Sequence, residues 1–300
     1  MLTSLISLVE EKSSLPALDF LLSKLIETFP SDISTFADCG AGIGSSAVKY
    51  STLLSKHSPA KVICYEPLPE NLLELAGRLK HLPNIEIRPV AVGKLAGQAT
   101  FSVPRRMTGP SAIWGPGTSA TGYIGERPGL DNITVDVVRL GDEPYPRFDF
   151  IKMDLQGGEA DALEGLGNKA QHAKMLFVEQ QLLGGPEAPE PMSLKILHDL
   201  GFVCFYDEIQ FGLVSTISEI PIRLFEIGGM KVTKILMPNG RGLPFSGRAV
   251  FTAKRSEKLS ATGTFEPGFI RELKGAGVPW MATDIIAINR SIMPVFATWF

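Results

Sequence analysis

The chain has 300 residues, and its 32 acidic and 29 basic side chains leave it with a formal net charge of −3. This near balance excludes a highly charged tail, and the isoelectric point of about 5.9 disfavours a basic nucleic-acid-binding face. A hydrophobic share of 44% supplies enough apolar surface for a packed core, which excludes disorder as the main state. The length suits one large domain or two small ones.

The cysteine pattern and the hydropathy indicate where in the cell the protein resides. Cys39, Cys64 and Cys204 lie in apolar segments without metal-ligand spacing, and their odd number leaves at least one free thiol. No basic region precedes the first apolar residues, and no window approaches the run of about 18 apolar residues that a membrane span requires. We therefore expect a cytoplasmic protein with no metal site and no membrane partner.

The first predicted element is an N-terminal helical segment, residues 1–32. Its apolar side chains recur at spacings of three and four, and Pro30 follows the last of them. This periodicity predicts helices that pack on the edge of a sheet. The residues that carry it are Leu18, Leu21, Leu22, Leu25, Ile26 and Phe29.

Short apolar runs then alternate with helical patterns. The runs have the length and continuity of strands buried on both faces: 33–37, 62–65, 150–153 and 175–178. The apolar residues between and after them have helical spacing, over 43–54, 72–79 and 194–200. This alternation predicts an α/β fold, with an open, mostly parallel sheet and helices on both faces.

A stretch dense in glycine and proline, residues 104–132, interrupts the alternation. It lies between two strand patterns at 100–103 and 133–138, which predicts a long hairpin-like excursion. A shorter interruption covers 184–191. We assign residues 33–300 to one domain that contains this excursion and a later insertion.

The last third contains a longer insertion, about 212–280. The runs 202–206 and 284–288 flank it and are expected to form a final antiparallel pair of strands. The insertion contains one further strand candidate, 249–253. The apolar tail, 292–300, is expected to pack on the core of its own chain.

The motif that carries chemistry follows the first predicted strand. Asp38-Cys39-Gly40-Ala41-Gly42-Ile43-Gly44 runs directly into a helical pattern that opens with Ser45. Glycines let the backbone approach a ligand closely, and a helix N-terminus offers free N–H groups to an anion. A dinucleotide fingerprint requires glycine where Ser45 stands, and Asp38 repels a pyrophosphate but attracts an ammonium or sulfonium group. The loop therefore favours S-adenosylmethionine over NAD and disfavours a nicotinamide dehydrogenase.

A carboxylate ends the second predicted strand. Glu66 stands 22 residues after Gly44, where it can accept hydrogen bonds from both hydroxyls of a ribose. A purely structural interpretation stays open, in which the loop is a tight turn capped by Asp38 and Glu66 lies on the surface.

Further motifs complete a pattern over residues 33 to about 181. They are Tyr65-Glu66-Pro67 with Asn71, Val90-Ala91-Val92-Gly93 with Gly97, the block Phe150-Ile151-Lys152-Met153-Asp154-Leu155-Gln156-Gly157-Gly158-Glu159, and Leu176-Phe177-Val178-Glu179. With the glycine loop they resemble the FkbM family of S-adenosylmethionine-dependent methyltransferases. The combination is much more specific than a glycine loop alone.

The resemblance implies a class I methyltransferase fold, which is a Rossmann-like sheet of seven strands with the last antiparallel. It also implies S-adenosyl-L-methionine as cofactor and methyl transfer to a hydroxyl of a small molecule, natural product or sugar. The implied cofactor-binding residues are Asp38, Gly40 and Gly42 at the methionine end, Glu66 at the ribose, and Ala91 and Val92 at the adenine, with Ala41, Gly44 and Pro67 beside them.

The catalytic residues are harder to assign, because the chain departs from the family at two positions. Gln156 replaces the usual Glu, and Gln181 stands two residues beyond Glu179, where a His is common. A His base would be the one most easily tuned to neutral pH. The remaining candidates at strand tips are Asp154, Glu159 and Glu179. Glu159 fits a structural role equally well, as an acidic residue in the first turn of a helix.

Two functions therefore stay open. The first is an O-methyltransferase in which residues 104–132 form a lid over the acceptor. The second is a protein that binds the nucleoside cofactor on the same scaffold without methyl transfer, which the two glutamines motivate. We expect a small-molecule or glycan acceptor, no nucleic-acid partner, and a homo-oligomer as one option for the assembly.

Overall fold

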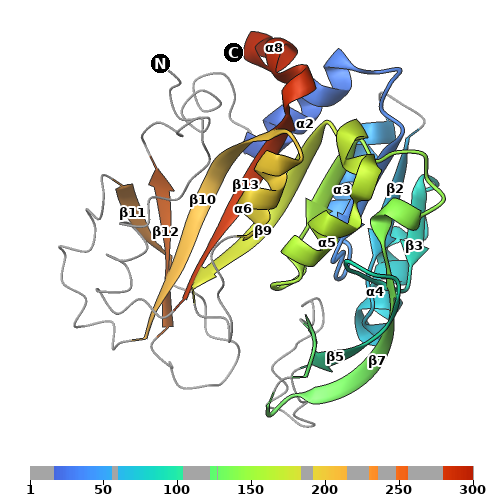
Figure 1. The fold of residues 1–300 in the computed structure, drawn as a ribbon, viewed down its shortest axis with the longest axis vertical. Coiled ribbons are helices and arrows are strands. Elements are labelled where there is room, and N and C mark those ends of the chain that lie inside the picture. The colour runs from blue at the N-terminus through green and yellow to red at the C-terminus, as the bar shows by residue number, and fades with distance from the viewer. Residues whose placement is uncertain are drawn as a thin grey trace.

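The computed structural model describes residues 17–55, 60–103, 122–126, 128–183, 192–214, 230–235, 248–255 and 280–299. The larger of two sheets in the described part has nine strands in the order β11-β12-β10-β13-β9-β8-β1-β2-β3. Figure 1 shows its arrangement. The four apolar runs expected to be buried strands form or overlap four of its members. Five neighbouring strands are parallel, namely β9 (Met175–Leu183), β8 (Phe150–Met153), β1 (Thr35–Cys39), β2 (Lys61–Tyr65) and β3 (Ile85–Arg88).

The other end of the sheet contains the last strands of the chain. β13 (Trp280–Asn289) is antiparallel to both of its neighbours, β9 and β10 (Phe202–Val214). The expected final antiparallel pair and the class I arrangement are therefore confirmed. β12 (Arg248–Arg255) and β11 (Met230–Ile235), both within the expected insertion, extend this edge by two antiparallel strands. β12 contains the strand candidate 249–253, whereas β11 was not expected.

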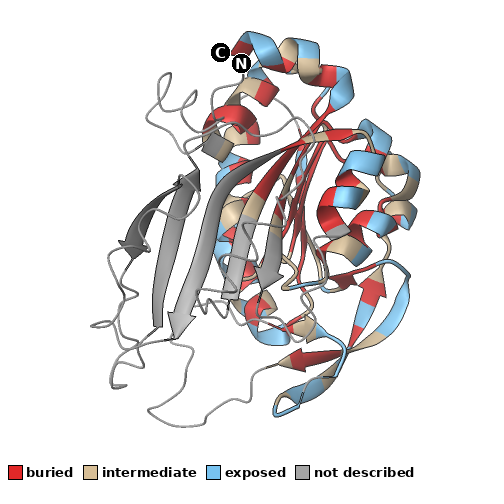
Figure 2. Ribbon diagram, turned by 60° about the vertical axis from the view of Figure 1, so that its left-hand side comes forward, coloured by how far each residue is buried: buried red, intermediate tan, exposed pale blue. Residues whose placement is uncertain are grey.

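Helices cover both faces of the sheet, as expected for this fold class. Successive strand residues point to opposite faces. Phe36 and Phe150 therefore pack in the core beneath α2, α3 and α4, while Ala37 and Ile151 pack in the core beneath α5 and α6. Figure 2 shows the buried strands in the middle of the molecule with partly exposed helices around them. No helix in the described ranges is long and apolar enough to cross a bilayer. The helices are α2 (Ala17–Thr28), α3 (Ser45–Ser55), α4 (Pro69–Leu79), α5 (Glu159–Gly165) and α6 (Met192–Asp199).

Both ends of the described chain pack on the hydrophobic core that contains Phe36 and Phe150. α2 confirms the helical periodicity of the N-terminal segment, of which residues 1–16 lie outside the described part. The expected packing of the tail is also confirmed, because Ile292, Phe296 and Trp299 are buried in that core, and Trp299 Nε1 donates to Thr28 Oγ1 at 3.1 Å. The tail consists of η5 (Arg290–Ile292), α8 (Met293–Phe296) and η6 (Ala297–Trp299).

A second, smaller sheet precedes β8 in the chain. Its strand order is β4-β7-β5-β6, and β5 and β7 form the antiparallel hairpin that the flanking strand patterns predict. The hairpin emerges below the main sheet in Figure 1. Residues 104–121 and 127 of the excursion lie outside the described part, as does the interruption at 184–191. The strands are β4 (Ala91–Val92), β5 (Gly97–Val103), β6 (Tyr123–Ile124) and β7 (Asp131–Val138).

Candidate active site

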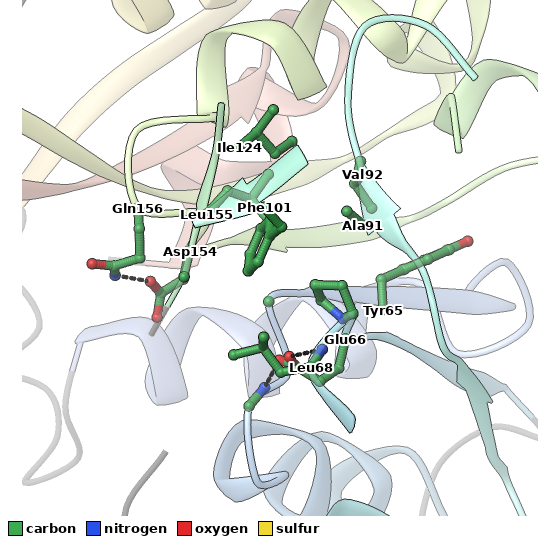
Figure 3. Close-up of a pocket in the computed structure, with 14 residues that line it drawn as sticks. Tyr65, Glu66, Leu68, Ala91, Val92, Phe101, Ile124, Asp154, Leu155 and Gln156 are labelled. Carbon is green, nitrogen blue, oxygen red and sulfur yellow. Dashed lines mark hydrogen bonds between the residues drawn. The ribbon is translucent and has the colours of Figure 1, made fainter. Parts of the chain in front are cut away.

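A cavity of about 160 Å³ lies where the carboxyl ends of β1, β2 and β8 meet. Ligands of open α/β sheets bind at this end of the strands. Figure 3 shows Asp154 and Gln156 on one side of the cavity and Ala91, Val92 and Tyr65 on the other. The lining residues are Gly40, Gly42, Tyr65, Glu66, Pro67, Leu68, Ala91, Val92, Phe101, Gly122, Ile124, Asp154, Leu155 and Gln156.

Most of the residues expected to bind the cofactor meet in this cavity. Gly40, Gly42, Glu66, Pro67, Ala91 and Val92 line it, as does the catalytic candidate Asp154. Five other candidates do not line it, namely Asp38, Ala41, Gly44, Glu159 and Glu179. Ala41 is buried in the core beneath α3, and the roles assigned to all five stay predictions.

The glycines of the first loop allow close packing of protein against protein. A Cβ on Gly40, whose φ is 77°, would lie 2.0 Å from the carbonyl oxygen of Asp154. A Cβ on Gly44, whose φ is 89°, would lie 2.8 Å from Leu75 Cδ1 of α4. Gly40 therefore brings the loops after β1 and β8 together, and Gly44 seats the start of α3 against α4.

Glu66 is buried at the tip of β2 and holds the glycine loop in place. Its Oε2 accepts a hydrogen bond from the Gly42 N–H at 2.8 Å, and its Oε1 accepts one from the Leu68 N–H at 2.9 Å (Figure 3). Burial raises the pKa of Glu66 to about 7, against the opposing effect of these hydrogen bonds. The Asn71 side chain also donates a hydrogen bond to this carboxylate. Three donors therefore occupy three of its roughly four lone-pair sites and leave one for a further donor.

Asp38 and Lys152 form a buried pair beside the cavity. The residues are register partners on β1 and β8, and Lys152 Nζ lies 3.4 Å from Asp38 Oδ1. Asp38 is wholly buried, and neither of its oxygens accepts a hydrogen bond from the described protein atoms. Burial raises its pKa against the attraction of Lys152. Burial alone would lower the pKa of Lys152, but the carboxylates of Asp38 and Asp154 outweigh it and raise that pKa.

The side chain of Gln156 joins two of the catalytic candidates. Its Nε2 donates to Asp154 Oδ1 at 2.8 Å and to Glu179 Oε2 at 3.0 Å. Lys152 Nζ lies 3.4 Å from the other oxygen of Asp154. Burial and then the negative charge of Asp154 raise the pKa of Glu179 to about 9. Lys152, Glu179 and Gln156 together outweigh burial at Asp154 and lower its pKa.

Glu159 holds the loop between β8 and α5. It is 2% exposed, and its carboxylate accepts hydrogen bonds from the Leu155 N–H at 2.7 Å and the Gly157 N–H at 3.0 Å. Burial raises its pKa to about 7. α5 begins at Glu159, so the structural alternative of the sequence analysis, an acid in the first turn of a helix, describes its position.

The far side of the cavity is apolar and comes largely from the second sheet. Leu68, Ala91 and Phe101 are buried in one small cluster, and Gly122 packs so closely on Phe101 that a Cβ there would lie 2.0 Å from its ring. Ile124 is partly exposed at the mouth. Sequence reasoning missed Leu68, Phe101 and Ile124, although the strand pattern at 100–103 indicated a strand whose inward residues would need a partner.

Comparisons with known proteins agree with this geometry. The family model described as "Methyltransferase FkbM domain" matches residues 38–204, which is more than half of the chain. Among curated proteins, no match was found.

Several solved structures resemble the chain at low identity. The methyltransferase FkbM of Methylobacillus flagellatus KT is 16% identical with a TM-score of 0.38, over 74% of this chain and 44% of that one. This chain therefore spans less than half the length of that relative. The precorrin-6y C5,15-methyltransferase of Geobacter metallireducens GS-15 is 13% identical with a TM-score of 0.37, over 89% and 87%. The StiE O-MT fragment 942-1257 is 9% identical with a TM-score of 0.39, over 90% and 73%.

Proposed function

We propose that this chain, which belongs to the methyltransferase FkbM domain family, is an S-adenosylmethionine-dependent O-methyltransferase. The acceptor we infer is a hydroxyl of a small molecule, natural product or sugar. The observation that carries the proposal is the single cavity that joins the glycine loop, Glu66 and Asp154 from three neighbouring strand tips. The cofactor would supply a methyl group on a positively charged sulfur.

The residues of the cavity fit the two ends of that cofactor. The carboxylate of Glu66 has one acceptor site left for a ribose hydroxyl, beside the donors Gly42, Leu68 and Asn71. Leu68, Ala91 and Phe101 offer an apolar surface for a flat base. On the opposite side, Asp154 supplies a carboxylate that suits a positive charge.

Transfer to a hydroxyl requires that its oxygen be aligned and its proton removed, and alignment alone can supply a large part of the rate. In this proposal the acceptor hydroxyl lies near Asp154, the ionised carboxylate that lines the cavity. Phe101 and Ile124 shield the cavity from water on the side of the second sheet. A lid over the acceptor stays the hypothesis for the excursion 104–132, of which residues 104–121 and 127 lie outside the described part.

A protein that binds the cofactor without transfer is the second candidate. The observation that favours it is that Gln156 already occupies hydrogen-bonding atoms of both Asp154 and Glu179. Gln181, in β9 opposite Ala282, stands where the family commonly has His. This candidate predicts cofactor binding without methylation of any acceptor in a broad screen.

A thermal-shift panel is the first experiment, because only a ligand that prefers the native state raises the midpoint. S-adenosylhomocysteine should raise it, while NAD and NADP should not. A screen of hydroxylated small molecules and sugars with labelled S-adenosylmethionine then separates the two candidates. A response to NAD alone would contradict both.

A further inference from the structure

A hydrogen-bonded cluster of Asp154, Gln156 and Glu179 has no role in the cofactor contacts proposed for the glycine loop and Glu66. We propose that Asp154 and Glu179, held together by the amide of Gln156, are a carboxyl pair that shares one proton, and that the pair recognises the positive charge of the methyl donor by releasing this proton to solvent. The inference rests on the proposed use of S-adenosylmethionine. It makes Gln156 a positioning residue rather than a catalytic one.

The hydrogen-bond geometry supports the pairing. A glutamine amide nitrogen carries two N–H donors, and Gln156 Nε2 directs one to Asp154 and the other to Glu179, at 2.8 and 3.0 Å. A glutamate at this position would place a third carboxyl between the two and offer no such donors. The departure from the family motif therefore suits a residue that bridges two acidic groups.

The backbone of Gln156 gives independent support. Among the described non-glycine residues, it alone has a positive φ, of 54°. Such a conformation costs free energy and persists where the surroundings determine it. The two hydrogen bonds of the side chain, together with the Glu159 carboxylate that holds the amides of Leu155 and Gly157, fix the loop in this conformation.

The charged groups around the pair favour one proton rather than none or two. Lys152 on β8 faces Asp154 and holds it ionised, and Asp38 on β1 takes part of the charge of the same lysine. Glu159 of α5 and Asp284 of β13, the register partner of Glu179, add negative charge around Glu179. The proton therefore resides on Glu179, whose pKa is raised to about 9 by burial and by Asp154.

Asp154, one member of the pair, lies at the end of the cavity where a sulfonium is expected. Asp154 and Gln156 line the wall opposite Ala91 and Val92, the residues expected at the adenine (Figure 3). A positive charge that arrives here favours the fully ionised pair, and an opposite charge at about 4–6 Å lowers a carboxyl pKa by about 1–3 units. The neutral thioether of the demethylated product has no such effect.

Calorimetry measures this difference without a methyl acceptor. S-adenosylmethionine and S-adenosylhomocysteine are titrated into the whole chain at pH 8 in Tris and in phosphate, whose ionisation enthalpies differ. From the pKa of about 9, we expect the donor to release about 0.4 to 0.9 protons more than the product. Proton release from Glu66 on ribose binding is common to both ligands and cancels in this comparison.

Three variants locate the effect. Glu179→Gln removes the titrating group and should abolish the difference between the two ligands, and Asp154→Asn is a second variant with the same expectation. Gln156→Asn keeps an amide and tolerates positive φ, but it is one methylene too short to bridge both carboxyls, so the difference should fall by more than half. Glu27→Gln, on α2 and paired with Lys24 at 2.8 Å, is the matched control that should leave it unchanged.

The outcomes separate the inference from the proposed function. Binding of both ligands with equal proton release in the wild-type protein overturns the shared-proton pair and leaves the methyltransferase proposal intact. A difference that persists in both Glu179→Gln and Asp154→Asn overturns it too. If neither ligand binds, the proposed function fails and the inference fails with it.

Discussion

The most informative single change is Glu66→Ala. In the structure this carboxylate accepts the N–H groups of Gly42 and Leu68, one on each oxygen, and it is only 4% exposed. In the proposed complex the same carboxylate also accepts a ribose hydroxyl. Truncation therefore affects the ligand-free loop and the bound ligand at once, and the two effects require separate measurements.

The two effects are separate quantities with expected sizes of their own. Hydrogen bonds to a charged acceptor contribute about 1.5–3 kcal/mol each, so loss of the one to ribose should weaken S-adenosylhomocysteine binding by roughly ten-fold to a hundred-fold. Two backbone N–H groups also lose their acceptor, at about 1–3 kcal/mol each. Because removal of the buried carboxyl relieves its desolvation, we expect a net loss of about 1–3 kcal/mol in unfolding free energy.

Titration calorimetry with S-adenosylhomocysteine measures the first quantity, and urea denaturation measures the second. Glu74→Ala is the matched control, because Glu74 lies on the helix that follows Glu66 and forms a partly exposed ion pair with Arg78, at 3.4 Å. It should change each free energy by less than about 1 kcal/mol. An alanine variant at position 66 that remains folded and binds within about twofold of wild type would refute the ribose assignment.

Two further predictions concern stability. Gly40→Ala should lower the unfolding free energy by about 3 kcal/mol or more, because its Cβ would lie 2.0 Å from the Asp154 carbonyl oxygen at a φ of 77°. Gly77→Ala, within α4 where a Cβ meets nothing within 4 Å, should instead raise the unfolding free energy by about 0.5–1 kcal/mol. Urea denaturation measures both variants, and equal unfolding free energies would contradict the packing argument. Unfolding free energy should also fall as pH rises from about 5 to 8, because the pKa values of Glu66 and Glu159, raised to about 7, let the folded protein hold protons that the unfolded chain has lost. The upper bound is about 3 kcal/mol per group, and Glu159→Gln should reduce the slope.

The parts of the site that follow directly after strands were predictable from the sequence. Gly40, Glu66 and Asp154 each stand just beyond an apolar run, and parallel strands bring their carboxyl ends to one edge of a sheet. The strands themselves were predictable because central strands buried on both faces are continuous apolar segments without polar alternation. Convergence of these three residues therefore required only the order of the elements.

The parts that depend on side-chain direction were not predictable. Asp38 belongs to the same motif as Gly40, yet its side chain lies wholly buried beside Lys152, because the period of the strand points it toward α3 rather than into the cavity. Phe101 reaches the cavity from the second sheet, whose docking depends on contacts such as that of Gly122 with its ring. No local pattern in the sequence gives the docking of the second sheet. The division into residues 1–32 and 33–300 stays a prediction.

Gln156 shows why a departure from a motif requires its geometry before a function is assigned. In sequence, replacement of an acid by an amide indicates a lost catalytic group and motivates a protein that binds but does not transfer. In the structure, the amide donates to two carboxyls that lie 25 residues apart in the chain, Asp154 and Glu179. Two adjacent carboxylates repel each other, so such a pair requires donors or a shared proton to persist. On the proposal made above, the glutamine supplies the donors and the pair keeps the proton until a positive charge arrives. Suppose that Gln156→Asn lowers the extra proton release on S-adenosylmethionine binding and retains the affinity for S-adenosylhomocysteine. The glutamine that replaces the family's acid would then be shown to adapt the site to its methyl donor.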